Sequence, residues 1–262
     1  NPGTKVASTP SDGTLETSAA GTPNGTGAHV SDVVPGNTYT FTVFNVATIH
    51  SVEYWSAADS ETVHDLATPT ISFTSSPAKT ATAGQAVALS AKLTTVGTNP
   101  TGTVTFRTAS RVLCTATVTA AHTAQCSTTA ALIGSQGTAD PESGITMSAD
   151  YNGDSTDAPS SADHSLIVKR VAPTATIKSA GQHTKKVTIT ATISGPAGGA
   201  TGPVTMTSGS HRLCRTTLHS GRAACHATAK TLGGGKHRVT IHYAGNTSYL
   251  AHTTKVSVTL KK

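Results

Sequence analysis

The amino-acid sequence predicts an all-β chain of tandem antiparallel β-sandwiches in an elongated arrangement. One stretch occurs twice, at residues 101–127 and 201–227, with its first cysteines, Cys114 and Cys214, 100 positions apart. Apolar and polar residues alternate along short segments, the pattern of half-buried strands. Aromatic residues make up only 4% of a composition dominated by Thr, Ser, Ala and Gly, which suits strands and turns. The repeat divides the chain into module 1 (1–67), module 2 (68–170) and module 3 (171–262).

Module 1 contains one clear strand signal. Tyr39, Phe41 and Val43 alternate with threonines, as expected of a half-buried strand. Residues 52–57 and 61–66 are expected to supply a further strand and an exit toward module 2. Residues 1–30 show little periodicity and are predicted to form loops or weak strands.

A turn before this strand resembles a motif of fibronectin type III domains. Val34-Pro35-Gly36 followed by Tyr39 is similar to the tyrosine corner of that family, in which the Tyr hydroxyl bonds back to the preceding corner. The resemblance covers about residues 30–66 and implies the C-terminal part of such a module, with its start missing or much altered. The alternative is half of a divergent Ig-like sandwich.

Modules 2 and 3 each contain about seven strand segments in the same order. Period-2 alternation with turns between the segments predicts an antiparallel sandwich in each module. Module 2 has about eight additional residues after its second cysteine, which we interpret as a loop insertion. The predicted strands lie near 70–74, 87–93, 104–106, 112–118, 124–128, 145–151 and 165–168 in module 2, and near 175–177, 187–193, 204–206, 213–218, 223–228, 239–243 and 256–260 in module 3.

Two motifs in these modules resemble bacterial Ig-like repeat domains. A Tyr-x-Gly-Asp/Asn turn follows a late strand at residues 151–154 and 243–246, and a Gly-x-Val-x-Phe type strand occurs at 102–106 and 202–206. The resemblance spans about residues 68–262. It implies a spacer, stalk or binding module of a secreted or surface protein or of a phage particle, and it does not imply an enzyme.

The four cysteines predict two structural disulfides, Cys114–Cys126 and Cys214–Cys225. Paired cysteines at matching places in a repeat favour an oxidising, extracellular compartment. Each bridge is expected to join successive strands within a hairpin rather than to link two sheets. The alternative for module 3 is a zinc site, because Cys214, Cys225, His219 and His226 are zinc-ligand types, although their spacing matches no recognised zinc pattern.

No catalytic motif is present, and we predict neither an enzyme nor a cofactor. The sequence has no Gly-x-Ser-x-Gly, His-Glu-x-x-His or phosphate-binding loop motif. A weak calcium candidate is formed by Asp150, Asn152, Asp154 and Asp157, whose spacing is similar to the opening of an EF-hand loop. Ser155 stands where that loop has glycine and no glutamate closes it, so a solvated turn is the competing interpretation.

Charge is distributed very unevenly along the chain. Module 1 has one lysine against seven acids, module 2 has six basic and six acidic residues, and module 3 has twelve Lys and Arg with no Asp or Glu. Seven of the twelve histidines are also in module 3, and they add positive charge below about pH 6.5. The candidate residues for contact with an anionic partner are Lys185, Lys186, Arg212, Arg215, Arg222, Lys236 and Arg238; Arg212 and Arg222 flank the cysteines and are expected to share one edge of the sandwich.

These observations predict a non-enzymatic structural or adhesive segment, extracellular at a bacterial surface or secreted. The expected partner is an anionic surface polymer, glycan or acidic protein face, and the competing interpretation is a solvated surface. Sequence-specific nucleic-acid binding and a transmembrane segment are not expected. The charge gradient raises head-to-tail self-association as a hypothesis. The first residues, Asn1-Pro2, predict that a leader or a longer N-terminal part has been removed. Alternatives are a bacteriophage virion component and an accessory region of a secreted polysaccharide hydrolase.

Overall fold

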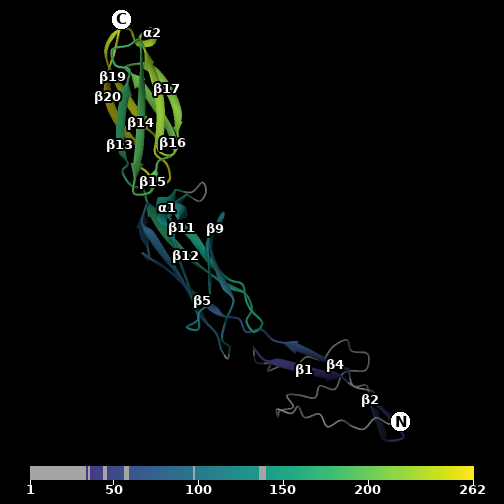
Figure 1. The fold of residues 1–262 in the computed structure, drawn as a ribbon. Helices are drawn as coiled ribbons and strands as arrows, with labels where there is room; N and C mark the ends of the chain where they lie inside the picture. The colour runs from purple at the N-terminus through teal and green to yellow at the C-terminus, as the bar shows by residue number, and fades with distance from the viewer. Residues whose placement is uncertain (1–33, 35, 44–45, 56–58, 97, 136–139) are drawn as a thin grey trace.

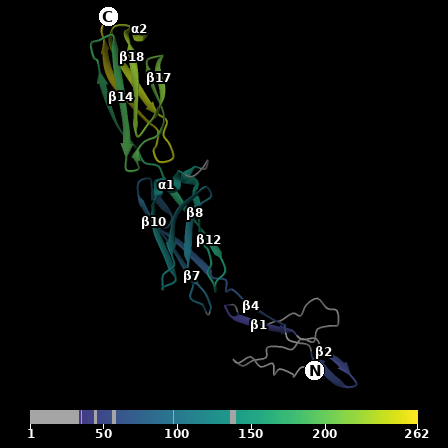
Figure 2. The same ribbon diagram turned by 45° about the vertical axis from the view of Figure 1, so that its right-hand side comes forward.

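The predicted fold class is confirmed: the chain is all-β, with two β-sandwiches in tandem. The computed structural model describes residues 34, 36–43, 46–55, 59–96, 98–135 and 140–262. Modules 2 and 3 follow one another end to end, and the strands of module 1 lie beyond the far end of module 2 (Figures 1 and 2). Neither α-helix in the described residues has the length and apolarity to span a bilayer.

Four strands of module 1 are described, and they pair as two antiparallel ribbons. The Tyr39 hydroxyl accepts a hydrogen bond from the Val34 N–H at 2.6 Å and donates one to the Val34 carbonyl at 3.3 Å. The bond expected of a tyrosine corner is therefore present, whereas residues 1–33 and Pro35 lie outside the described residues. The ribbons pair β1 (Thr38–Val43) with β4 (Asp59–His64) and β2 (Val46–Ile49) with β3 (Val52–Trp55).

Module 2 packs a three-stranded sheet against a five-stranded one. The alternation that predicted these strands matches their burial: Val87, Leu89, Ala91 and Leu93 are at most 1% exposed. Part of the expected loop insertion is helical. The first sheet has the order β10 (Thr123–Thr129), β7 (Ala86–Thr94), β5 (Thr70–Ser76), and the second β6 (Thr80–Thr82), β12 (Ser160–Lys169), β11 (Ile145–Tyr151), β8 (Thr103–Thr108), β9 (Arg111–Thr117); α1 (Ala130–Gly134) and a 3-10 turn (Pro141–Ser143) follow β10.

Module 3 repeats this architecture with a separate core. Ile189, Val204 and Val239 are fully buried, and its core residues form a cluster distinct from that of module 2. One sheet contains β13 (Thr174–Ala180), β14 (Lys186–Gly195) and β18 (Arg222–Thr228), with β15 (Gly198–Gly199) beside β14; the other has the order β17 (His211–Leu218), β16 (Gly202–Ser208), β19 (Gly235–Tyr243), β20 (His252–Leu260), and α2 (Ala229–Leu232) follows β18.

Both predicted disulfides are present, but the expectation that each lies within a hairpin is wrong. Strand β9 is the edge of the five-stranded sheet, whereas β10 pairs with β7 in the other sheet. Cys114 and Cys126 therefore link the two sheets, with their Cα atoms 6.4 Å apart. In module 3, Cys214 on β17 and Cys225 on β18 do the same across 6.1 Å. In the sequence, the short turn between the two strands looks like that of a hairpin. In the structure, the strand before the turn joins one sheet and the strand after it joins the other.

Modules 2 and 3 are joined almost without a linker. Strand β12 ends at Lys169, and Val171 already belongs to module 3, where its N–H donates to the Ser248 carbonyl at 3.0 Å. Beside this junction Gly84, with φ +94°, lies against Pro196: a Cβ at Gly84 would be 2.6 Å from the Pro196 carbonyl carbon. Close backbone contact and a single intervening residue, Arg170, therefore fix how the sandwiches follow one another.

Candidate anion-binding surface

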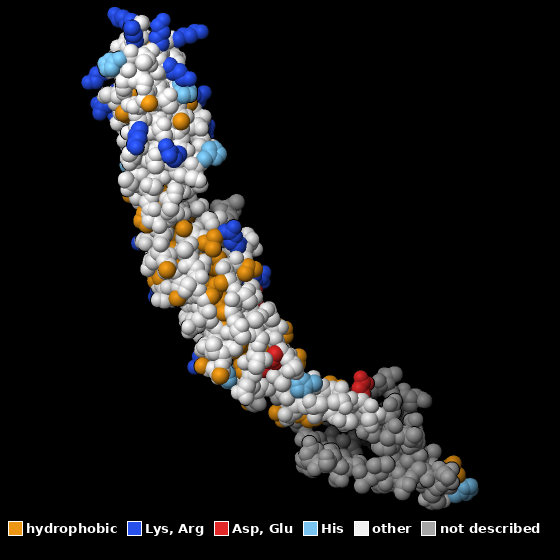
Figure 3. All heavy atoms as spheres, viewed as in Figure 1, with side chains coloured by type: hydrophobic (Ala, Val, Ile, Leu, Met, Phe, Trp, Pro, Cys, Tyr) orange, Lys and Arg blue, Asp and Glu red, His pale blue; other side chains and the backbone are white. Residues whose placement is uncertain are grey.

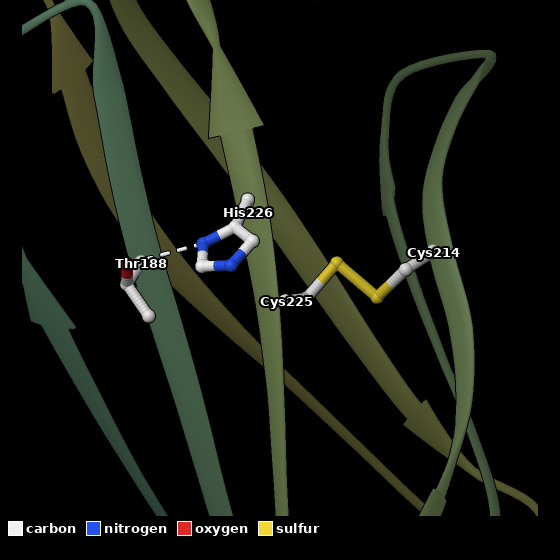
Figure 4. Close-up of a disulfide and its surroundings, with 4 residues drawn as sticks. All are labelled: Thr188, Cys214, Cys225 and His226. Atoms are coloured by element: carbon white, nitrogen blue, oxygen red, sulfur yellow. Dashed lines mark hydrogen bonds between the residues drawn. A yellow bond between two sulfur atoms is a disulfide. The ribbon is translucent and has the colours of Figure 1, made fainter.

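The cysteines and histidines of module 3 do not converge on a metal site. Cys214 and Cys225 are bonded to each other, so their sulfur atoms are not free thiolates. His226 follows Cys225 on β18 and points the opposite way, with its Nδ1 3.1 Å from the Thr188 hydroxyl on β14 (Figure 4). The zinc alternative is therefore contradicted by the geometry.

Asp154 organises the turn after β11 in module 2. Its Oδ1 accepts hydrogen bonds from the backbone N–H groups of Thr156 and Asp157, each at 2.8 Å. Its Oδ2 accepts from the N–H of Thr101 at 2.7 Å and from the Thr101 hydroxyl at 2.6 Å. Burial alone would raise the pKa of the Asp154 carboxyl, but these hydrogen bonds outweigh burial and hold the pKa well below its usual range.

Asn246 has the same position in module 3 and keeps the turn without a charge. Its Oδ1 accepts from the N–H groups of Ser248 and Tyr249, each at 2.8 Å. Its Nδ2 donates to the Thr201 hydroxyl at 3.1 Å, whereas in module 2 Thr101 is the donor. One turn geometry thus serves both modules, and the carboxylate of module 2 is not required for it.

The calcium candidate residues have other partners. Asp150 pairs with Arg107, and the Asn152 amide donates to the Thr103 hydroxyl at 2.9 Å. Asp157 is fully buried and accepts from the Thr98 hydroxyl at 2.7 Å. Among the described residues, no three His, Cys, Asp or Glu side chains are grouped as metal ligands would be. These contacts favour the interpretation as a hydrogen-bonded turn.

Asp154 is expected to make the stability of module 2 dependent on pH. The hydrogen bonds depress the pKa of Asp154 in the folded state. The contribution of its carboxylate to the free energy of unfolding is therefore complete above the pKa of the unfolded state, about 3.9, and is lost as the pH falls below that value. In Asp154→Asn, thermal unfolding of module 2 between pH 6 and pH 2.5 is expected to depend less steeply on pH. Module 3 has no Asp or Glu and serves as the internal control. Equal pH dependence in both proteins would contradict this role.

Basic residues lie along module 3, and many of them are at its distal end, the end farther from module 2 (Figure 3). This end contains the β13–β14 turn, α2 and the C-terminus (Figure 1). Two hydrogen bonds hold these segments together: Lys261 N–H donates to the Thr184 carbonyl and Ala229 N–H to the Lys185 carbonyl, both at 2.9 Å. We define the cationic tip as the six exposed lysines on these segments and at the start of β19: Lys185, Lys186, Lys230, Lys236, Lys261 and Lys262.

The candidate arginines are spread along module 3 and are not grouped at the tip. Arg212 is the second residue of β17, at the distal end, but Arg222 begins β18 and pairs with Thr192 near the opposite end. Strands β17 and β18 lie along the same edge of the sandwich, joined by the disulfide, but Arg212 and Arg222 are at opposite ends of that edge. Arg215 lies at mid-strand opposite Thr205, and Arg238 lies three residues into β19, opposite Ser257.

Sequence reasoning left Lys230, Lys261 and Lys262 out of the candidate set. Lys230 is on α2, a four-residue helix that no periodicity could reveal. The strand order that the repeat predicts could have indicated all three lysines. Once the strand directions are known, the start of β14 and the ends of β18 and β20 must lie at the same end of the module.

The tip lysines have no acidic neighbours to neutralise them. Module 3 contains no Asp or Glu, and the ion pairs of the described residues all lie in module 2. At the equivalent end of module 2, Arg170 pairs with Glu142 at 3.3 Å and with Asp140 at 3.9 Å. The same fold thus has acidic residues paired with a basic one at this end in module 2 and has no acidic residue at it in module 3.

Comparisons with known proteins agree with the architecture. The model of a bacterial Ig-like domain (group 3) matches residues 73–169 and again 173–261, and the match does not extend into module 1. No curated protein matches the chain. Among solved structures, the human OSCAR ligand-binding domain is 13% identical over 73% of this chain and 98% of its own, with a TM-score of 0.28, which is too low to support an argument.

Proposed function

The chain belongs to the bacterial Ig-like domain (group 3) family, and from this premise we propose that it is a non-enzymatic stalk of a bacterial surface or adhesive protein. The matched domains are of a kind typical of surface and adhesion proteins, and no catalytic domain is identified in these residues. Two disulfides are typical of proteins outside the cytosol. The basic end of module 3 is the part that contacts an anionic polymer or an acidic protein face.

The observation that carries this proposal is the direct junction between the sandwiches. A stalk must keep its two ends apart, and a flexible linker would let them approach each other. Here only Arg170 lies between the end of β12 and the first hydrogen bond of Val171 within module 3. The contact between Gly84 and Pro196 further limits bending at this point.

Module 1 extends the proposal. We infer that its described ribbons belong to the C-terminal part of a fibronectin type III-like module. The support is the pair of hydrogen bonds between Tyr39 and Val34 at the start of β1, together with the antiparallel pairing of β1 with β4.

Small-angle X-ray scattering tests the stalk. A compact chain of 262 residues would have a radius of gyration of about 18 Å. We expect a value clearly above this, with the distance distribution of a rod. Insertion of eight Gly and Ser residues between Arg170 and Val171 is expected to broaden that distribution and to leave both unfolding transitions unchanged. A wild-type radius of gyration near 18 Å would contradict the proposal.

A further inference from the structure

The cationic tip is arranged differently from a solvated charged surface. Its lysines come from separate segments that backbone hydrogen bonds hold in place, at Lys261 with Thr184 and at Ala229 with Lys185. Lys236 pairs with Thr259 on β20, one position before the strand ends. The six charges are therefore fixed to one end of the rod, although each side chain is exposed.

Six uncompensated cations at one end repel one another and lower the stability of the module. Module 2 shows that this fold does not require such an arrangement, because Glu142 and Asp140 accompany Arg170 at its equivalent end. A surface that must only remain soluble is better made with both signs of charge interspersed. The absence of any acid from all of module 3 thus points to a ligand that neutralises the tip.

The exposure of the lysines indicates what kind of ligand this is. An exposed lysine binds a single small anion weakly, because water screens the pair. A polymer with closely spaced charges contacts several lysines at once and releases its condensed counterions, so its affinity rises with its charge density. Lysine ammonium groups act as point charges that bind phosphate from any direction, which suits a flexible chain.

We propose that the cationic tip is an end-on docking surface for an extended polymer with phosphate groups along its chain. Contact is made by the end of the stalk, and the strand faces of module 3 are not part of the site. The inference rests on the proposed stalk function, because a site confined to the tip is presented to a partner only when the rod is extended.

The experiment compares two triple variants of the full chain with equal net charge. The tip variant is Lys185→Gln, Lys230→Gln and Lys261→Gln; the side variant is Arg215→Gln, Arg222→Gln and Lys255→Gln. All six positions are exposed, so both variants are expected to unfold like the wild type. Arg215 and Lys255 lie at mid-strand and Arg222 lies at the end next to module 2. The side variant therefore removes the same number of charges as the tip variant, but away from the tip.

Binding to inorganic polyphosphate is measured at several salt concentrations. At physiological salt we expect the tip variant to lose roughly 100-fold in affinity, from a factor of about 5 for each lysine. Its plot of log affinity against log salt is expected to be shallower by about 2–3. The side variant is expected to stay within about 3-fold of the wild type with an unchanged slope.

Three results would overturn the inference. Equal losses in the two variants would mean that the charge of the module acts as a whole. Equal affinity for polyglutamate of matched length would remove the preference for phosphate. The third result is a wild type that forms oligomers at low salt but does not bind polyphosphate. If the tip variant abolished these oligomers, the partner would be a second copy of this chain. The stalk proposal is judged separately, because it depends on the scattering profile and not on any of these binding results.

Discussion

Replacement of Phe106 by alanine is expected to destabilise module 2 by about 3–5 kcal/mol. Phe106 is fully buried at the centre of β8, and its ring centroid is 5.4 Å from that of Phe73 on the facing sheet. Few aromatic residues contribute to this core, and its other members are mostly Val, Leu, Ile and Ala. The cavity left by the ring would therefore lie between two sheets that have few large side chains with which to fill it.

The repeat provides the control for this substitution. Met206 is fully buried at the equivalent position of module 3, so the same architecture accepts methionine there. Phe106→Met is expected to cost less than about 1.5 kcal/mol, because volume is largely retained. Urea unfolding of both variants is the measurement. The transition of module 3 should not move, and a loss below about 1 kcal/mol in Phe106→Ala would contradict the assignment of Phe106 to the centre of the core.

Removal of the Cys214–Cys225 bridge is expected to destabilise module 3 by about 3 kcal/mol. The bridge closes a loop with a sequence separation of 11, and its loss frees this segment in the unfolded chain. Strands β17 and β18 belong to different sheets. The backbone pairing recorded between these segments is a single isolated pair at their turn, His219 with Arg222. The disulfide is thus the covalent connection between two sheet edges that lack a continuous ladder.

The double variant Cys214→Ala with Cys225→Ala isolates this effect. The variant Cys114→Ala with Cys126→Ala makes the same change in module 2 and should leave module 3 unaltered, which separates local stabilisation from a general effect of cysteine replacement. Chemical denaturation followed by circular dichroism distinguishes the two transitions. A change below about 1 kcal/mol in each module would show that the sheets hold together without their bridges.

The strands could be predicted from the sequence because one face of each is buried. In β7, Val87, Leu89, Ala91 and Leu93 are buried and alternate with exposed or partly exposed residues, and a shift by one residue would expose all four. The disulfide pairing also followed from the repeat. The sheet to which each cysteine belongs did not follow, because a tight turn between two strands looks the same whether or not they continue as a hairpin.

The candidate surface was only partly predictable for a related reason. Sequence reveals that module 3 is basic, but the end at which each charge lies depends on strand direction and on which loops meet. Lys185 and Lys261 are 76 positions apart in the sequence and become neighbours through the hydrogen bond from Lys261 to Thr184. Arg212 and Arg222 are close in sequence and are separated by the length of β17.

The parallel pairing of β6 with β12 determines how module 2 responds to tension along the rod. Thr80 to Thr82 pair with Ile167 to Lys169, so a pull on the two ends of the module slides these strands past each other and loads their hydrogen bonds together. When the module finally gives way, the segment between Cys114 and Cys126, with a sequence separation of 12, stays closed. Each such bridge holds back roughly 40 Å of chain, so a module unfolded by tension extends less far until its disulfide is reduced.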